Sequence, residues 1–84
     1  MIPRIKSIKA LPDLILEVVF DDGYEVLYDV KEDLGMPGFG VLSEIPGMFE
    51  NFVLDESRSI VSWSKEVDLP SHALYEYGKP IART

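Results

Sequence analysis

The chain has 84 residues, no cysteine, an apolar fraction of 46% and a net charge of −7 at pH 7. This length suits one small folded domain, which we expect over residues 1–84 with a frayed tail over about 79–84. The lack of cysteine excludes disulfides and thiolate zinc sites. No apolar run is long enough for a signal peptide or a membrane-spanning helix, so we expect a cytoplasmic protein that does not bind a membrane.

The charges are unevenly spread along the chain. Residues 1–12 carry three bases and no acid, whereas residues 13–56 carry twelve acids and one base. Nucleic-acid binding needs a basic footprint, which this balance does not provide. A basic protein partner is the electrostatic complement of the acidic segment. The alternative is that the acids only keep a small domain in solution.

The N-terminal part of the chain predicts a β-hairpin. Residues 5–11 form an extended segment, and residues 14–20 are rich in β-branched and aromatic side chains with an alternating apolar face. Asp22-Gly23 is a strong hairpin signal, and a type I′ turn is expected there. Residues 24–30 return as the second strand of this hairpin, so that its two strands and turn span 14–30.

The middle of the chain alternates short elements and breaks. Residues 31–34 are expected to form one helical turn. Residues 35–40 contain three glycines and one proline, which indicates a loop. Another helical turn is expected at Met48 and Phe49, just after Pro46.

The C-terminal part predicts a second hairpin and a helix. Residues 52–54 and 59–63 are apolar runs on either side of a polar four-residue connection. A short helix is expected over 69–78, with Ser71 as its N-cap and Gly78 at its end. The predicted fold is a small α+β domain with one mainly antiparallel sheet of four or five strands, short helical segments and a short C-terminal helix. The expected core residues are Leu16, Val18, Phe20, Val26, Tyr28, Phe49, Phe52, Leu54, Ile60, Trp63 and Leu74.

Several segments occur in an order that is similar to a known family. The sequence resembles the family of small bacterial domains numbered 2442 among the domains of unknown function, over about residues 3–75. The resemblance implies a cytoplasmic α+β domain and no catalytic residues. It also suggests a regulatory setting, in some members an arrangement like a toxin–antitoxin pair. The residues that carry it are Phe20-Asp21-Asp22-Gly23, Asp29, Phe39, Leu42, Phe49, Phe52-Val53-Leu54-Asp55, Ile60, Trp63, Val67-Asp68-Leu69 and Leu74-Tyr75.

Carboxylates gather around the first hairpin, but their spacing does not match a known metal loop. Asp21 and Asp22 are adjacent, whereas the EF-hand pattern needs alternating ligands. Adjacent strand residues also point to opposite faces. Turn formation and solvation explain these acids, and we expect no metal and no cofactor.

The leading functional hypothesis is a non-enzymatic protein-interaction or regulatory module, the acidic member of a two-protein pair. Its expected interaction surface combines acids with aromatic and flexible apolar residues, which suit interfaces. One alternative is a metal- or small-molecule-dependent enzyme using Asp21, Asp22, Asp29 and His72. Another is a homodimer or larger homo-oligomer formed through an exposed sheet edge. The candidate surface residues are Asp21, Asp22, Glu25, Asp29, Met36, Phe39, Tyr75 and Tyr77.

Overall fold

The computed structural model describes residues 2–81, which form antiparallel strands and short helices in an α+β arrangement. The predicted fold class is thereby confirmed. The strands are β1 (Ile5–Leu11), β2 (Ile15–Phe20), β3 (Glu25–Asp29), β4 (Val53–Leu54), β5 (Ile60–Ser62), β6 (Asp68–Pro70) and β7 (Lys79–Pro80). The helices are the 3₁₀ helix η1 (Val30–Asp33), α1 (Val41–Glu44) and α2 (Ser71–Tyr77).

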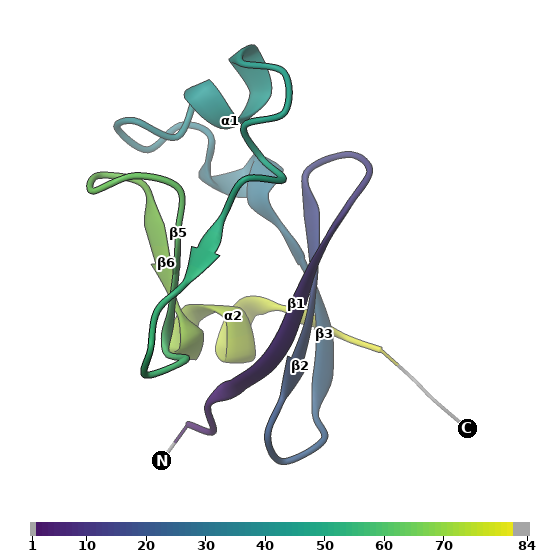
Figure 1. Ribbon diagram of the computed structural model, residues 1–84. Coiled ribbons are helices and arrows are strands. Elements are labelled where there is room, and N and C mark those ends of the chain that lie inside the picture. Colours follow the sequence, from purple (N-terminus) through teal and green to yellow (C-terminus); the bar gives the residue numbers. More distant parts are fainter. Residues whose placement is uncertain (1, 82–84) are drawn as a thin grey trace.

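The strands form two sheets, so the expected single sheet is wrong. One sheet has the order β1-β2-β3-β7 and the other has the order β4-β5-β6. Figure 1 shows the two sheets beside each other, with α1 at one end of the molecule and α2 between the lower parts of the sheets. Each sheet has one strongly apolar face, and packing these faces together buries both, which extending a single sheet would not do.

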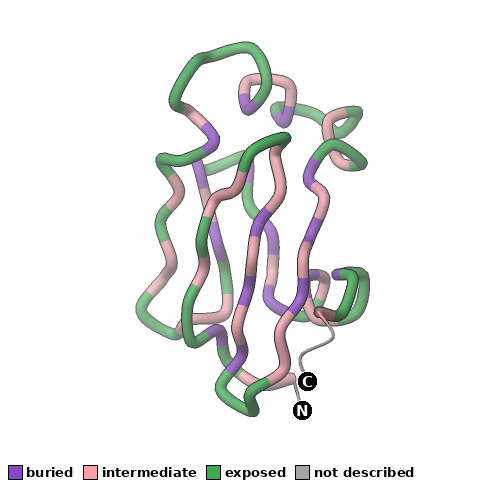
Figure 2. The backbone as a smooth tube through the Cα atoms, turned by 90° about the vertical axis from the view of Figure 1, so that its right-hand side faces the viewer, coloured by how far each residue is buried: buried purple, intermediate pink, exposed green. Residues whose placement is uncertain are grey.

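Alternation of side chains builds the first sheet as predicted. Leu16, Val18 and Phe20 of β2 are fully buried, whereas the residues between them are half-buried. Val26 and Tyr28 of β3 face the same interior. The alternating burial along these strands is visible in Figure 2. A period of two is what a strand with one covered face requires.

The turn between β2 and β3 is not the expected type I′ turn. That turn needs positive φ at both central residues, but Asp22 is not among the positive-φ residues, and Gly23 has φ of 90°. The Phe20 carbonyl accepts from the Gly23 N–H at 2.9 Å, and the Phe20 N–H donates to Tyr24 O at 2.9 Å. The loop therefore has three residues and ends on a left-handed glycine. The Asp22 carboxylate accepts from the Tyr24 N–H at 2.9 Å and stabilises this loop.

The segment between the sheets contains the predicted breaks. η1 is the helical turn expected after the first hairpin, and residues 35–40 form turns without helix or strand. At Met48 the expected helical turn is a hydrogen-bonded turn only, closed by a bond from Met48 N–H to Ile45 O at 3.1 Å. Trp63 holds this segment: its indole N–H donates to Phe49 O at 2.8 Å, and the two rings stack.

The C-terminal part differs from expectation in three places. β6 extends the second hairpin, and α2 begins only at Ser71, so the N-cap is Pro70 and not Ser71. Gly78 is the C-cap, as predicted. β7 pairs with β3 through Lys79 and Pro80, so the expected fraying is wrong for these two residues. The remaining tail, residues 82–84, lies outside the described residues.

The core prediction fails most clearly at Ile60, which is 40% exposed. Val61 lies on the inner face of β5 and Trp63, just after the strand, is also buried; strand alternation then turns Ile60 outward. Phe52 and Leu54 are partly buried against the core. The other predicted core residues are buried. Buried hydrophobic residues that were not predicted are Ile5, Val30, Phe39, Leu42, Val61, Val67 and Leu69.

Candidate functional site

The carboxylate of Asp21 joins the two sheets. Both of its oxygens accept from the Arg58 guanidinium, with Nη1–Oδ1 and Nη2–Oδ2 distances of 3.0 Å. Arg58 lies in the turn between β4 and β5, and its Nη1 also donates to Ile5 O at 3.4 Å. A two-pronged arginine–carboxylate pair fixes orientation as well as charge. This predicted surface residue therefore has a partner within the fold.

Asp22 and Tyr75 are bound to each other. The Tyr75 hydroxyl donates to Asp22 Oδ2 at 3.1 Å, and this hydrogen bond to a carboxylate raises the pKa of Tyr75 above its ordinary value. The Tyr75 ring lies 4.9 Å from the Phe20 ring and 4.7 Å from the Tyr24 ring, measured between centroids. These contacts attach α2 to the tip of the first hairpin.

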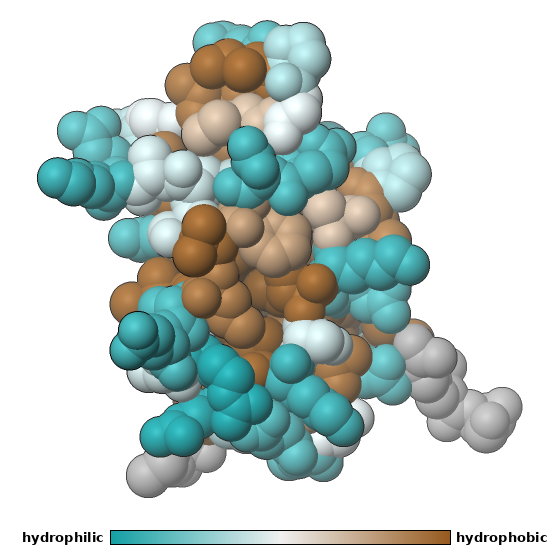
Figure 3. Space-filling view, viewed as in Figure 1, coloured by the Kyte–Doolittle hydropathy of each residue, from teal (hydrophilic) through white to brown (hydrophobic). Residues whose placement is uncertain are grey.

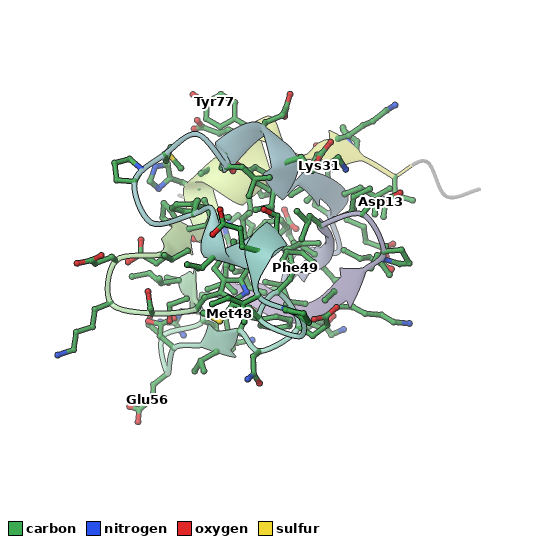
Figure 4. The ribbon with its side chains drawn as sticks, turned by 90° about the horizontal axis from the view of Figure 1, so that it is seen from above. Asp13, Lys31, Met48, Phe49, Glu56 and Tyr77 are labelled. Carbon is green, nitrogen blue, oxygen red and sulfur yellow. The ribbon has the colours of Figure 1, made fainter. Side chains whose placement is uncertain are left out.

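Asp29 lies at the opposite end of the hairpin, where it binds Lys31. Its side chain caps η1 by accepting from the Lys31 N–H at 2.9 Å, and it pairs with Lys31 Nζ at 3.1 Å. Lys31 Nζ also donates to Asp13 O at 2.5 Å, and Figure 4 shows these two residues near each other. Nearby, the Tyr28 hydroxyl donates to Asp33 Oδ2 at 2.6 Å, and burial, followed by this bond, raises the pKa of Tyr28 well above its ordinary value.

The remaining predicted surface residues are dispersed. Phe39 is 4% exposed and belongs to the core, so its place on the interaction surface is wrong. Met36 is 42% exposed and Tyr77 is 75% exposed, and Glu25 is half-buried with an interaction of its own. His72 is exposed on α2. The structure thus brings Asp22 and Tyr75 together but does not bring the eight predicted residues into one surface.

The residues proposed for acid–base or metal chemistry do not share a site. Asp21 and Asp22 follow β2, whereas Asp29 pairs with the first residue of that strand, Ile15, so they lie at its two ends. Within residues 2–81 no group of three or more acidic or histidine side chains is placed to hold a metal ion. No pocket is found in the same range.

A different set of residues, on the three-stranded sheet, forms a continuous surface. Val53 lies opposite Ser62, which lies opposite Asp68, and Ile60 lies opposite Pro70. Asp55 is the neighbour of Ile60 across the β4–β5 turn, because its N–H donates to Ile60 O at 3.1 Å. By strand alternation these positions share the face opposite to that of the buried residues Val61 and Leu69. We call this set the outer face; its residues are Val53, Asp55, Ile60, Ser62, Asp68 and Pro70.

The outer face exposes apolar side chains on adjacent strands. Val53 is 63% exposed and Ile60 is 40% exposed, whereas Val61 between them in the ladder is fully buried. Figure 3 shows apolar side chains gathered over the region that β4 and β5 occupy in Figure 1. Isolated exposed hydrophobics are ordinary, but neighbouring ones on one sheet face form a patch of the kind that binds partners.

Carboxylates stand beside these apolar side chains. Asp55 accepts from the backbone N–H groups of Ser59 and Ile60, each at 2.9 Å, and from the Ser57 hydroxyl. These bonds, with the Ser57 hydroxyl foremost, lower the pKa of Asp55 to about 2, so it is an anion at any physiological pH. Asp68 pairs with Ser62 through its backbone, and its exposed carboxylate forms no ion pair within the described range.

Replacing Asp55 with asparagine is expected to change the acid response of stability. A carboxylate whose folded pKa lies below its unfolded value of 3.8 stabilises the fold above about pH 4, and this contribution is lost as the pH falls towards 2. The melting temperature of the Asp55→Asn variant should therefore fall less between pH 4 and 2 than that of the native protein. Asp68→Asn is the matched control, and a native-like slope in Asp55→Asn would contradict the assignment.

One residue of the outer face, Ile60, could have been placed there from the sequence. Val61 and Trp63 are two apart and both are strongly apolar, so Ile60 had to lie on the other side of the strand. The position of Val53 carried no such signal, because β4 has only two residues.

No helix within residues 2–81 is long and apolar enough to cross a membrane.

Comparison with known proteins gives a family and no individual relative. No curated protein and no solved structure matches the sequence. The family described as "Protein of unknown function (DUF2442)" matches residues 5–80, which is nearly the whole chain. The chain therefore belongs to the DUF2442 family.

Proposed function

We propose that this protein is a protein-interaction module, the acidic member of a two-protein regulatory pair, and that its basic partner docks on the outer face. The observation that carries this proposal is the adjacency of exposed Val53 and Ile60 on β4 and β5. Their burial by a partner would remove apolar area from water, which is the main source of affinity in most protein complexes.

The charges around the exposed apolar residues favour a basic partner. Asp55 and Asp68 lie on the outer face itself, and Glu56 follows directly in the exposed turn. Arg58 lies in the same turn, but its guanidinium is bound to Asp21. The outer face is therefore negative, and complementary lysine or arginine residues on the partner would increase the association rate and reject acidic proteins.

The proposal is tested by variant-dependent capture. The native protein and the Ile60→Asp variant are immobilised, incubated with lysate of the native cell at low salt, and compared by mass spectrometry. We expect a basic protein that the native chain retains, that Ile60→Asp loses by at least tenfold, and that dissociates as salt screens the charges.

Tyr77→Asp provides the matched control. Tyr77 is 75% exposed on α2, and Figure 4 shows it across the molecule from Glu56. This variant adds the same charge and also removes an exposed apolar side chain, so it should retain the partner. Equal capture by Ile60→Asp and the native chain, or equal loss with Tyr77→Asp, would reject the outer face as the binding site.

A further inference from the structure

Each sheet has two edge strands, β1 and β7 in one and β4 and β6 in the other. These four edge strands differ in how they are protected from pairing with another chain. β1 carries Lys6 and Lys9 and an irregular register between Ile5 and Ser7. β6 ends with Pro70 and β7 contains Pro80. Lysine, bulges and proline are devices that keep sheet edges from adding a further strand.

β4 lacks these devices. It pairs only with β5, and it contains neither proline nor a charged residue. Its short length is its one protection. Val53 on this strand is also the most exposed aliphatic side chain among the large exposed hydrophobics. An unprotected edge thus adjoins the apolar part of the outer face.

The backbone of β4 has groups directed away from β5. The Asp55 N–H donates to Ile60 O, so Asp55 and Ile60 form a hydrogen-bonded pair in this antiparallel ladder. Such pairs alternate with pairs that direct their N–H and C=O groups outward. Leu54, opposite Val61, is therefore an outward-directed residue. No backbone or side-chain bond to Leu54 from another segment occurs among the residues that the structure describes.

We propose that the partner docks as an extended segment that pairs with β4 and carries an apolar and a basic side chain two positions apart, on the same face of the added strand. The inference rests on the proposed function and names its binding mode. The free N–H and C=O of Leu54 would bond to the added strand, and Leu54 itself stays packed against the core. Alternate side chains of the added strand would lie beside Val53 and Asp55 on the outer face, which fits an apolar residue followed two positions later by a lysine or arginine.

A synthetic peptide tests the binding mode without the natural partner. The probe is a capped peptide of the repeat Val-Thr-Lys-Thr, which places valine and lysine two positions apart on one face of the strand. It is titrated into the labelled protein and followed by NMR with amide hydrogen exchange. In the free protein the Leu54 amide should exchange quickly and the Asp55 amide slowly. Saturating peptide should slow exchange at Leu54 by at least tenfold and leave Asp55 little changed.

Two comparisons separate strand pairing from charge attraction. A peptide of the same composition with its lysines and valines in separate blocks, and the same repeat with glutamate in place of lysine, should each bind at least tenfold more weakly. Leu54→Pro removes the outward N–H without removing a ladder bond and should lose the peptide by at least tenfold relative to Leu54→Ala, which keeps the N–H but also shortens the side chain.

Each result decides the proposal. Absence of saturable binding, equal binding of the block peptide, or unchanged exchange at Leu54 overturns strand pairing. If Leu54→Pro does not fold, the exchange measurement on the native chain still decides. Failure here with partner loss in Ile60→Asp would retain the outer face as a docking surface contacted by side chains alone, so the two proposals fail separately.

Discussion

Replacing Gly78 with alanine is expected to destabilise the fold by about 3 kcal/mol, because the added methyl group has no room. A Cβ at this position would lie 2.5 Å from Leu74 O and 2.7 Å from Cβ and Cγ2 of Val26. Both neighbours are held in place: Leu74 O accepts from the Gly78 N–H at 3.0 Å, and Val26 is fully buried in β3. The backbone must therefore shift, and the packing of α2 and β7 against β3 is lost in part.

Thermal unfolding measures this effect directly. For a domain of this size, about 3 kcal/mol lowers the melting temperature by roughly 12 to 24 °C. Gly35→Ala is the control, because nothing lies within 4 Å of its added Cβ and its φ is not in the left-handed region. That variant should be as stable as the native protein or slightly more so. Similar melting temperatures for both variants would show that α2 packs less closely on β3 than described.

Replacing Phe20 with alanine is expected to cost about 3 to 5 kcal/mol. Phe20 is among the largest fully buried side chains, and its ring contacts the rings of Tyr24 and Tyr75. Its loss would leave a cavity between the tip of the first hairpin and α2. Because small domains have only about 5 kcal/mol or somewhat more to lose, much of this variant should be unfolded at 25 °C.

Denaturant titration of Phe20→Ala measures this loss in the free energy of unfolding, with Phe20→Leu and Tyr77→Ala as comparison variants. Phe20→Leu keeps most of the apolar volume and should fall between the native protein and Phe20→Ala. Tyr77 is 75% exposed, so Tyr77→Ala should change the free energy of unfolding by less than about 0.5 kcal/mol. A small effect of Phe20→Ala would contradict a shared aromatic cluster at this end of the molecule.

Local patterns in the sequence predict most of the strands. The alternation of Leu16, Val18 and Phe20 identifies β2 and its inward face, and Gly23 marks the hairpin that follows. The glycine- and proline-rich segment at 35–40 predicts a break in regular structure, which the fold contains. Signals of this kind act within a few residues, and they succeed because strand alternation and turn geometry are local constraints.

Features set by distant parts of the chain were not predicted. β6 includes Leu69 and Pro70, which fell within the predicted helix, and pairing with β5 makes them a strand. β7 exists because α2 returns the chain to the free edge of β3. The partners of two predicted surface residues were missed for the same reason: Asp21 and Asp22 are bound by Arg58 and Tyr75, which lie far along the chain.

The division of the strands into two groups also has a consequence for folding kinetics. β1, β2 and β3 lie within residues 5–29, and β4, β5 and β6 lie within residues 53–70, so each group closes only short loops. The contacts between the groups are long-range ones, such as those of Arg58 with Asp21 and with Ile5. We expect each of the two groups of strands to form early and transiently, because each has only marginal stability alone. Their docking would then be the slow step, and the C-terminal strand, which joins β3 last in sequence, would complete it.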